Sequence, residues 1–146
     1  MITLVLVCLV LLVVTSLIHL EALTLLSLHL PHLRVPSRAK VLVAMAVLFF
    51  VHVLEIGAYG TGVWVLVDLA GVGGLAGPEA STLVNCLYFS AETYTSLGFG
   101  DITPLGPIRL LAGVEALNGL LLIGWAASYL YLAMARFWAT DEEHQA

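Results

Sequence analysis

Three long apolar stretches constrain the fold more than any other feature of this sequence. Residues 2–20 form a run of 19 residues without a formal charge, which is about 28 Å long as a helix. Residues 41–67 and 110–135 are also mainly apolar. A helix that crosses a membrane needs roughly 20 apolar residues. The sequence therefore predicts three membrane-spanning helices.

The composition excludes several other classes of protein. Of the 146 residues, 61% are hydrophobic and 10% are charged, whereas a soluble domain has about 25% charged residues. So few charges are not enough to cover the surface of a soluble globule. The net charge of −5 argues against nucleic acid as a partner. We expect an all-α membrane protein embedded in the lipid bilayer.

The distribution of basic residues predicts the orientation in the membrane. Arg34, Arg38 and Lys40 lie in the expected loop 31–40, after a first helix at residues 1–30 that Pro31 ends. This helix lacks a basic leader region and a cleavage site, so we expect it to be retained. Because basic loops face the cytoplasm, the prediction is a multi-pass plasma-membrane protein with its N-terminus outside and its C-terminus inside. Arg109 is an exception, because this orientation places it on the outer side of the membrane.

One apolar segment is too short to span the bilayer. Residues 81–95 open with the capping residues Ser81 and Thr82 and end in a glycine-rich turn. A short helix that ends in such a turn at membrane depth predicts a re-entrant segment. The expected order after the first loop is an outer helix at 41–69, a loop at 70–80, this short helix, the turn at 96–101, an inner helix at 107–138 and an acidic tail at 139–146.

The turn has the residue types needed to bind a dehydrated cation. Gly98 and Gly100 adopt backbone angles that other residues resist, and alternating them with other residues turns successive carbonyls to one side. Several such strands around an axis would stack rings of carbonyl oxygens, which replace the hydration shell of a monovalent cation. The Ser96 hydroxyl would complete the innermost ring. Asp101 would concentrate cations at the mouth.

The run from Ser96 to Asp101, preceded by Thr95, resembles the selectivity filter of the potassium channel family, T-x-G-Y-G-D. Ser96 stands where threonine is usual and Phe99 where tyrosine is commonest. The resemblance covers roughly residues 41–138 and implies a homotetrameric pore built from the outer helix, the re-entrant short helix, the filter and the inner helix. The first helix is an addition to this two-helix pore, and its role is open. It also implies that K+, the permeant ion rather than a cofactor, binds the backbone oxygens of Ser96, Leu97, Gly98 and Phe99, with Gly100 closing the filter.

The resemblance also assigns a supporting role to Glu92, nine residues before Asp101. In some two-helix bacterial members a glutamate at this place pairs with the filter aspartate. Two carboxyl groups that share a proton would brace the filter. The alternative is a glutamate that is capped or solvated at the outer vestibule.

The inner helix carries three candidate cavity and gate residues. Gly119 resembles the hinge glycine of the family, although close helix packing explains a small residue equally well; Gly124 is a second hinge candidate. Asn118 is expected either to face the cavity or to form an interhelical hydrogen bond. Glu115 is expected to point towards the short helix, in a structural hydrogen bond or in a gating role.

Other polar residues carry weaker signals. His19 and Glu21 in the first helix, and His52 and Glu55 in the second, suggest either a proton relay or polar packing. The histidines show no metal-ligand spacing that stands out. Cys8 and Cys86 are expected to be small buried residues. No nucleophile, base and metal set converges, so the chain is not expected to be an enzyme.

The function that these residues predict is a potassium-selective ion channel that assembles as a homotetramer. Its partners would be K+, the lipid bilayer and other copies of the chain. Two alternatives remain: a weakly selective monovalent cation channel, because Ser96 and Phe99 depart from the commonest filter, and a non-conducting membrane scaffold or accessory subunit.

Overall fold

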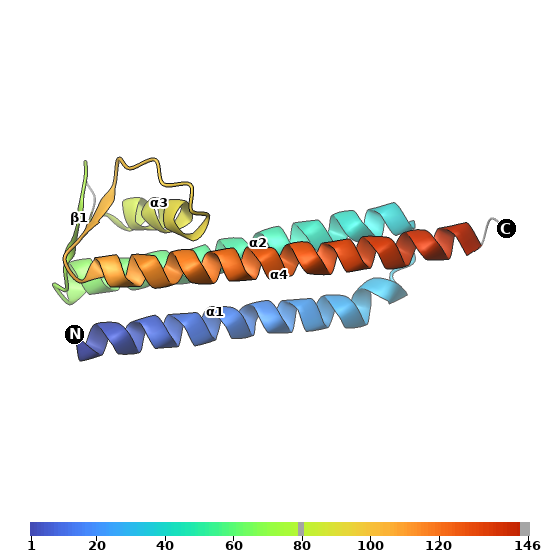
Figure 1. Ribbon diagram of the computed structural model, residues 1–146, viewed down its shortest axis with the longest axis horizontal. Coiled ribbons are helices and arrows are strands. Elements are labelled where there is room, and N and C mark those ends of the chain that lie inside the picture. Colours follow the sequence, from blue (N-terminus) through green and yellow to red (C-terminus); the bar gives the residue numbers. More distant parts are fainter. Residues whose placement is uncertain (79–80, 144–146) are drawn as a thin grey trace.

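The computed structural model describes residues 1–78 and 81–143 as a bundle of three long helices with a small subdomain at one end (Figure 1). The elements, in chain order, are α1 (Ile2–His29), a 3-10 turn (Leu30–His32), α2 (Ser37–Trp64), a π-helical turn (Val65–Leu69), β1 (Gly74–Ala76), α3 (Leu83–Tyr94), β2 (Thr103–Leu105) and α4 (Ile108–Glu143).

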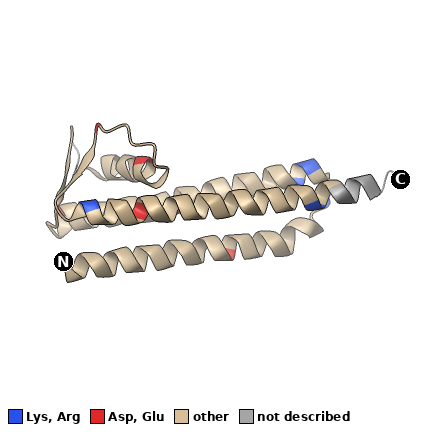
Figure 2. Ribbon diagram, viewed as in Figure 1, with Lys and Arg blue, Asp and Glu red and all other residues tan. Residues whose placement is uncertain are grey.

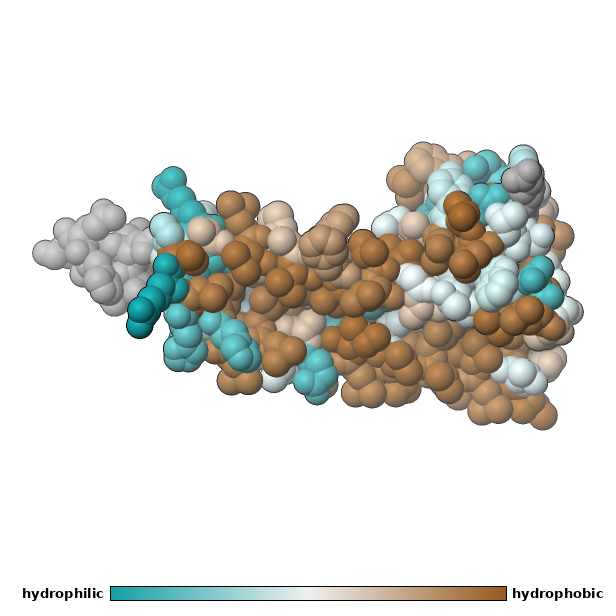
Figure 3. Space-filling view, turned by 180° about the vertical axis from the view of Figure 1, so that it is seen from behind, coloured by the Kyte–Doolittle hydropathy of each residue, from teal (hydrophilic) through white to brown (hydrophobic). Residues whose placement is uncertain are grey.

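The three long helices have the length and composition of membrane spans. The spans are Ile2–His32, Ser37–Leu69 and Ile108–Trp138, of 31, 33 and 31 residues. Large apolar side chains cover their outer surfaces (Figure 3), the reverse of the arrangement in a soluble protein. Helices satisfy their own backbone hydrogen bonds and therefore suit a bilayer. The chain is a multi-pass, mainly helical membrane protein.

The bundle interior has two apolar clusters with a polar layer between them. One cluster, around Leu4, Tyr59 and Leu111, lies at the end that carries α3. The other, around Leu26 and Ala133, lies at the opposite end. Between them, by position along the helices, five buried polar or charged side chains meet: Thr15, His19, Glu55, Glu115 and Asn118. This layer specifies how the three helices are aligned, because each polar group needs a partner.

Basic residues lie at the ends of the bundle (Figure 2). Arg34, Arg38 and Lys40 flank the connection from α1 to α2. The Lys40 ammonium donates a hydrogen bond to the Pro31 carbonyl, 2.9 Å away, and lies over the Phe137 ring at 5.1 Å from its centroid. These contacts join all three long helices at this end.

Several helix ends differ from the expected bounds. α2 begins at Ser37 rather than 41, because Pro36 occupies its N-cap position and proline suits a helix start. Arg38 and Lys40 therefore lie in its first turn rather than in a loop. α3 begins after Thr82, whose hydroxyl accepts a hydrogen bond from the Asn85 N–H. α4 extends into the expected acidic tail, of which residues 144–146 lie outside the described part.

A two-stranded antiparallel ribbon was not expected. β1 pairs with β2, with Gly74 opposite Leu105 and Ala76 opposite Thr103. Gly77 (φ +142°) packs against this ribbon, and a Cβ there would lie 2.6 Å from the Asp101 carbonyl oxygen. The glycine-rich loop after α2 is thus tied to the segment that precedes α4. Strands of three residues give too little alternation to be recognised from sequence.

Candidate functional site

The segment 95–101, between α3 and β2, has an alternating backbone. Ser96, Gly98 and Gly100 have positive φ angles of 56°, 58° and 82°, whereas the residues between them do not. Among the residues that the structure describes, Ser96 is the only one other than glycine with a positive φ. This alternation of φ is the backbone pattern that the filter prediction requires, and the direction of the carbonyl groups stays a prediction.

Hydrogen bonds at the end of α3 hold this conformation. The Ser96 N–H donates to the Thr93 carbonyl at 3.0 Å, and the Leu97 N–H donates to the Glu92 carbonyl at 2.9 Å. A left-handed non-glycine residue costs roughly 1–2 kcal/mol, so it persists only where neighbours enforce it. The Thr95 hydroxyl donates back to the Ala91 carbonyl at 2.7 Å. The helix end therefore sets the start of the segment.

The C-terminal end of α3 lies beside the middle of the membrane spans. The Ser90 hydroxyl donates to the Ile56 carbonyl at 2.9 Å, and the Tyr94 hydroxyl donates to Glu55 Oε2 at 2.5 Å. Glu55 and Ile56 lie near the centre of the span Ser37–Leu69. The chain then returns to β2, at the end of the bundle where α3 began (Figure 1). Residues 95–101 are exposed along this return.

Glu92 supports the segment directly. Its carboxylate is 4% exposed and accepts a hydrogen bond from the Phe99 backbone N–H at 3.1 Å. Hydrogen bonds to charged groups contribute about 1.5–3 kcal/mol. Glu92 therefore connects α3 to the middle of the glycine-rich segment.

Asp101 has a different partner from the one expected. The Tyr88 hydroxyl donates to Asp101 Oδ1 at 3.2 Å. Partial burial and the carboxylates of Glu92 and Asp101 raise the pKa of Tyr88 to about 12. Both carboxylates therefore act on Tyr88, and the proton-sharing pair of Glu92 and Asp101 stays a prediction. The sequence analysis missed Tyr88, which lies one helical turn before Glu92 and so on the same face of α3.

Glu115 points towards α3, as expected. Its side chain is fully buried, and its Oε1 lies in close contact with the Ser90 hydroxyl, whose single hydrogen is shared between this oxygen and the Ile56 carbonyl. Its second oxygen, Oε2, has no hydrogen-bond partner among the described residues. This geometry matches the expectation of a structural hydrogen bond for Glu115, and a role in gating stays a prediction.

Asn118 does not face a cavity, and that expectation is wrong. Its amide donates to Thr15 Oγ1 at 2.8 Å and to the Tyr59 hydroxyl at 3.1 Å. It thereby links α4 to both α1 and α2. The alternative of an interhelical hydrogen bond is the correct one.

Gly119 is a close-packing position. A Cβ at Gly119 would overlap the Tyr94 carbonyl oxygen and lie 2.9 Å from the Tyr94 carbonyl carbon. At Gly124, a Cβ would meet nothing within 4 Å. α4 is continuous through both glycines. The packing alternative for Gly119 therefore has a structural basis, while a hinge role stays a prediction.

The histidines and acidic residues of α1 and α2 come together only in part. Glu55 accepts hydrogen bonds from His19 at 3.0 Å and from His52 at 2.9 Å. Glu21 is exposed and lies outside this group. Tyr94 joins the group, and the sequence analysis missed it. Cys8 and Cys86 are buried, as predicted.

Comparison with known proteins identifies the family. The family profile described as "Ion channel" matches residues 41–136, which include α2, α3, the glycine-rich segment and most of α4. The chain belongs to this ion channel family. The match confirms that the chain resembles an ion-channel pore domain, and it leaves α1 outside the matched region.

Other comparisons add less. A stretch of 44 residues is 48% identical to Protein LctB of Geobacillus stearothermophilus and covers 30% of this chain and 33% of that protein. The chain thus spans about a third of the length of this relative. No solved structure matches the chain. The assignment as an ion channel therefore depends on the family match.

Proposed function

We propose that the chain is one subunit of a homotetrameric, potassium-selective channel. Its filter is the segment 96–100, in which K+ binds the backbone oxygens of Ser96, Leu97, Gly98 and Phe99 and the Ser96 hydroxyl. The observation that carries the proposal is the alternating left-handed backbone at Ser96, Gly98 and Gly100. Rings of carbonyl oxygens from such strands replace the hydration shell of K+.

The position of the segment supports a re-entrant loop. α3 ends beside the centre of the spans, and the chain returns to the end where α3 began. Exposed irregular backbone at that depth is tolerated only where it is buried in protein or lines water. In one chain Leu97 and Phe99 are 60% and 68% exposed. Neighbouring subunits would cover these side chains.

Four copies satisfy what one strand lacks. A single strand offers oxygens on one side of an ion, whereas K+ filters surround it with four loops. The C-terminal end of α3 carries the partial negative charge of its helix dipole and would face the cavity lined by α4. Asp101 would lie at the outer mouth. The basic end of the bundle, with Arg34, Arg38 and Lys40, would face the cytoplasm.

The decisive experiment measures ion flux in liposomes that contain the purified full chain. We expect K+ flux that Ba2+ blocks, and a reversal potential under K+/Na+ conditions that favours K+. Equal Na+ and K+ permeability would favour the weakly selective cation channel. Absence of flux from correctly assembled protein would favour the non-conducting scaffold and refute the proposal.

Two glycine variants connect the flux to the segment. Gly98 has φ +58° and open space around its Cβ position, so Gly98→Ala adds backbone strain of roughly 1–2 kcal/mol without a collision. That strain lowers the ratio of ordered to disordered filter by a factor of about 5–30, and flux should fall. Gly57→Ala, on α2 and also without neighbours within 4 Å, is the matched control.

Assembly is tested separately. Native mass spectrometry of the chain in detergent micelles should give four chains per particle. Monomers alone, under conditions in which the protein conducts, would refute the tetramer.

A further inference from the structure

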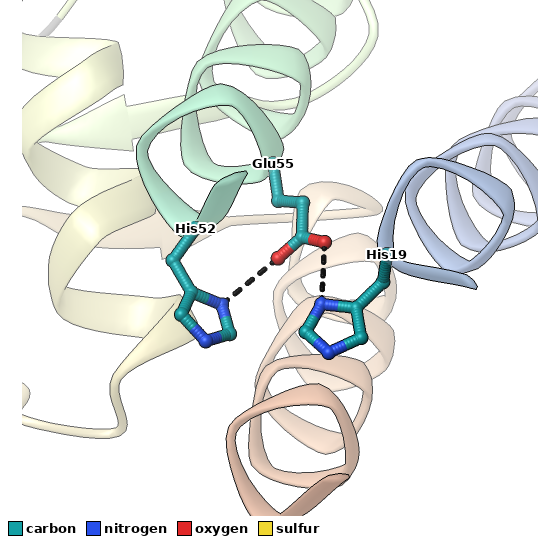
Figure 4. A group of neighbouring side chains, drawn as sticks. All are labelled: His19, His52 and Glu55. Carbon is teal, nitrogen blue, oxygen red and sulfur yellow. Dashed lines mark hydrogen bonds and ion pairs between the residues drawn. The ribbon is translucent and has the colours of Figure 1, made fainter. Parts of the chain in front are cut away.

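Two histidines from different helices converge on one carboxylate in the centre of the bundle. His19 lies on α1, and His52 and Glu55 lie one turn apart on α2; we call these three residues the histidine–glutamate cluster (Figure 4). His19 Nδ1 is 3.0 Å from Glu55 Oε1, and His52 Nδ1 is 2.9 Å from Glu55 Oε2. One ligand atom from each residue lies within 4.8 Å of the other two.

Hydrogen bonding alone satisfies the cluster poorly. His52 Nδ1, Glu55 Oε2 and the Tyr94 hydroxyl are mutually 2.5–2.9 Å apart. These three close contacts share at most two hydrogen atoms when His52 is neutral, one on the imidazole and one on the phenol. A cation bound between these three atoms would take the place of the shared hydrogen on His52 Nδ1, which would move to Nε2, and would be held by lone pairs in place of the strained set of hydrogen bonds.

The two ring nitrogens of His19 have different surroundings, and only Nδ1 faces the cluster. His19 is fully buried, and its Nε2 has no hydrogen-bond partner in the described part of the chain. An unsatisfied buried polar atom costs about 1–3 kcal/mol. When Nδ1 binds a metal, Nε2 carries the ring hydrogen, so Nε2 keeps the same lack of a partner with or without an ion, and the metal site depends on the Nδ1 contacts alone.

We propose that His19, His52 and Glu55 form a binding site for Zn2+ that joins α1 to α2. Two imidazole nitrogens and a carboxylate oxygen are a common ligand set for Zn2+, whereas Mg2+ and Ca2+ prefer oxygen ligands alone. Tetrahedral Zn2+ with bonds of about 2.0–2.1 Å needs ligand atoms roughly 3.3 Å apart. Each imidazole nitrogen lies 2.9–3.0 Å from one carboxylate oxygen, and one ligand atom from each residue lies within 4.8 Å of the other two, so small side-chain movements would form the site. The Tyr94 hydroxyl or a water would occupy the fourth position.

The site gives α1 a role that the family match does not. α1 lies outside the matched residues 41–136, and His19 is its contribution to the cluster. Glu55 also accepts a hydrogen bond from the hydroxyl of Tyr94. Tyr94 is the residue immediately before the glycine-rich segment. An ion in the cluster therefore clamps α1 to the helix pair that supports this segment. The side chain of His52 is 20% exposed, so the cluster reaches the surface of the single chain on the α2 side.

The test is direct metal binding, which does not depend on ion conduction. The full chain is purified in detergent micelles with a tag that contains no histidine, stripped with a chelator and titrated with Zn2+ against a chromogenic chelator. We expect one Zn2+ per chain. Since loss of an outer-shell partner alone weakens metal sites by about 10–100-fold, His19→Gln and His52→Gln should weaken binding by about 100-fold or more.

A matched control and a spectroscopic measurement complete the experiment. His29→Gln is the control, because His29 is exposed at the end of the same helix and bonds only to the Leu25 carbonyl among the contacts described. It should leave Zn2+ affinity unchanged. Co2+ in the unmodified chain should give the intense visible absorption of a four-coordinate site, a result that holds even if a variant fails to fold.

Three outcomes overturn the proposal. The unmodified chain takes up no Zn2+, or Co2+ shows only the weak absorption of a six-coordinate ion. In the third outcome, the His52→Gln variant folds and binds Zn2+ as tightly as His29→Gln. Position 52 suits this comparison because its side chain lies at the partly exposed edge of the cluster. Each of these outcomes leaves a hydrogen-bond network without a metal.

Discussion

The contact between Gly119 and Tyr94 gives the most quantitative prediction. A Cβ at Gly119 would lie 2.9 Å from the Tyr94 carbonyl carbon, and ordinary van der Waals contact begins at 3.4 Å. Gly119→Ala therefore forces α4 and the end of α3 apart. Such overpacking costs about 1–3 kcal/mol. The displaced group is a backbone carbonyl, so a side-chain rotation does not relieve the overlap.

Gly124→Ala is the matched control for this change. Both variants replace glycine by alanine in α4, so the gain of about 1 kcal/mol from helix propensity cancels between them. At Gly124 the new methyl group meets nothing within 4 Å. The difference between the variants is the contact alone, about 2 kcal/mol in the free energy of unfolding, or about 4–8 °C in Tm.

Thermal unfolding in detergent micelles, followed by tryptophan fluorescence, measures this difference. We expect Gly119→Ala to melt below Gly124→Ala and below the unmodified chain. If Gly119→Ala is as stable as Gly124→Ala, the close packing of α3 on α4 is refuted. Flux in liposomes separates packing from bending: loss of flux in Gly124→Ala at unchanged Tm would identify Gly124 as the hinge.

Three further predictions concern single polar groups. Glu92→Ala removes the acceptor of the Phe99 N–H and should lower K+ flux about tenfold or more, since such a bond contributes about 1.5–3 kcal/mol; Glu92→Gln, which keeps an oxygen acceptor, should retain most of it. Asn118→Leu removes two interhelical hydrogen bonds of about 0.6 kcal/mol each and should lower Tm by about 2–5 °C. Because the pKa of Tyr88 is raised to about 12, its contribution to stability should be lost as pH rises from 10 to 12, and Tyr88→Phe should remove this alkaline dependence.

Each of these predictions has an outcome that contradicts it. Equal flux from Glu92→Ala and Glu92→Gln would show that the hydrogen bond to Phe99 does not hold the segment. An unchanged Tm for Asn118→Leu would show that the amide does not hold the helices together. The sign for Tyr88 follows from proton binding: between pH 10 and 12 the folded chain keeps a proton that the unfolded chain has lost. Stability that rises over this window would refute the assignment.

The sequence by itself determined the class of protein and the main local elements. Long runs without charge permit a helix in a bilayer and little else, so the three spans follow from composition and length. The start of α3 at Thr82 follows from a capping hydroxyl. The left-handed positions at Gly98 and Gly100 follow from the absence of a Cβ. These features depend on residues close together in the chain, and for that reason sequence patterns reveal them.

Only the tertiary structure decided which polar groups meet. Asn118 is equally able to face a cavity or another helix until the rotation of α4 against α1 and α2 is known. The pairing of His19 with Glu55 joins residues 36 positions apart, and no spacing in the sequence records it. Tyr88 and Tyr94 look like ordinary apolar residues of a short helix, yet their hydroxyls bond Asp101 and Glu55.

The physical reason is the uniform apolar surface of the spans. In a soluble helix, a polar face marks the side towards water, whereas here apolar side chains surround each helix and do not reveal its inward face. Small and polar residues then decide the packing. Gly119 admits the Tyr94 carbonyl, and Glu115 accepts the Ser90 hydroxyl. Those contacts hold the C-terminal end of α3, and with it the start of the glycine-rich segment, beside the middle of the spans.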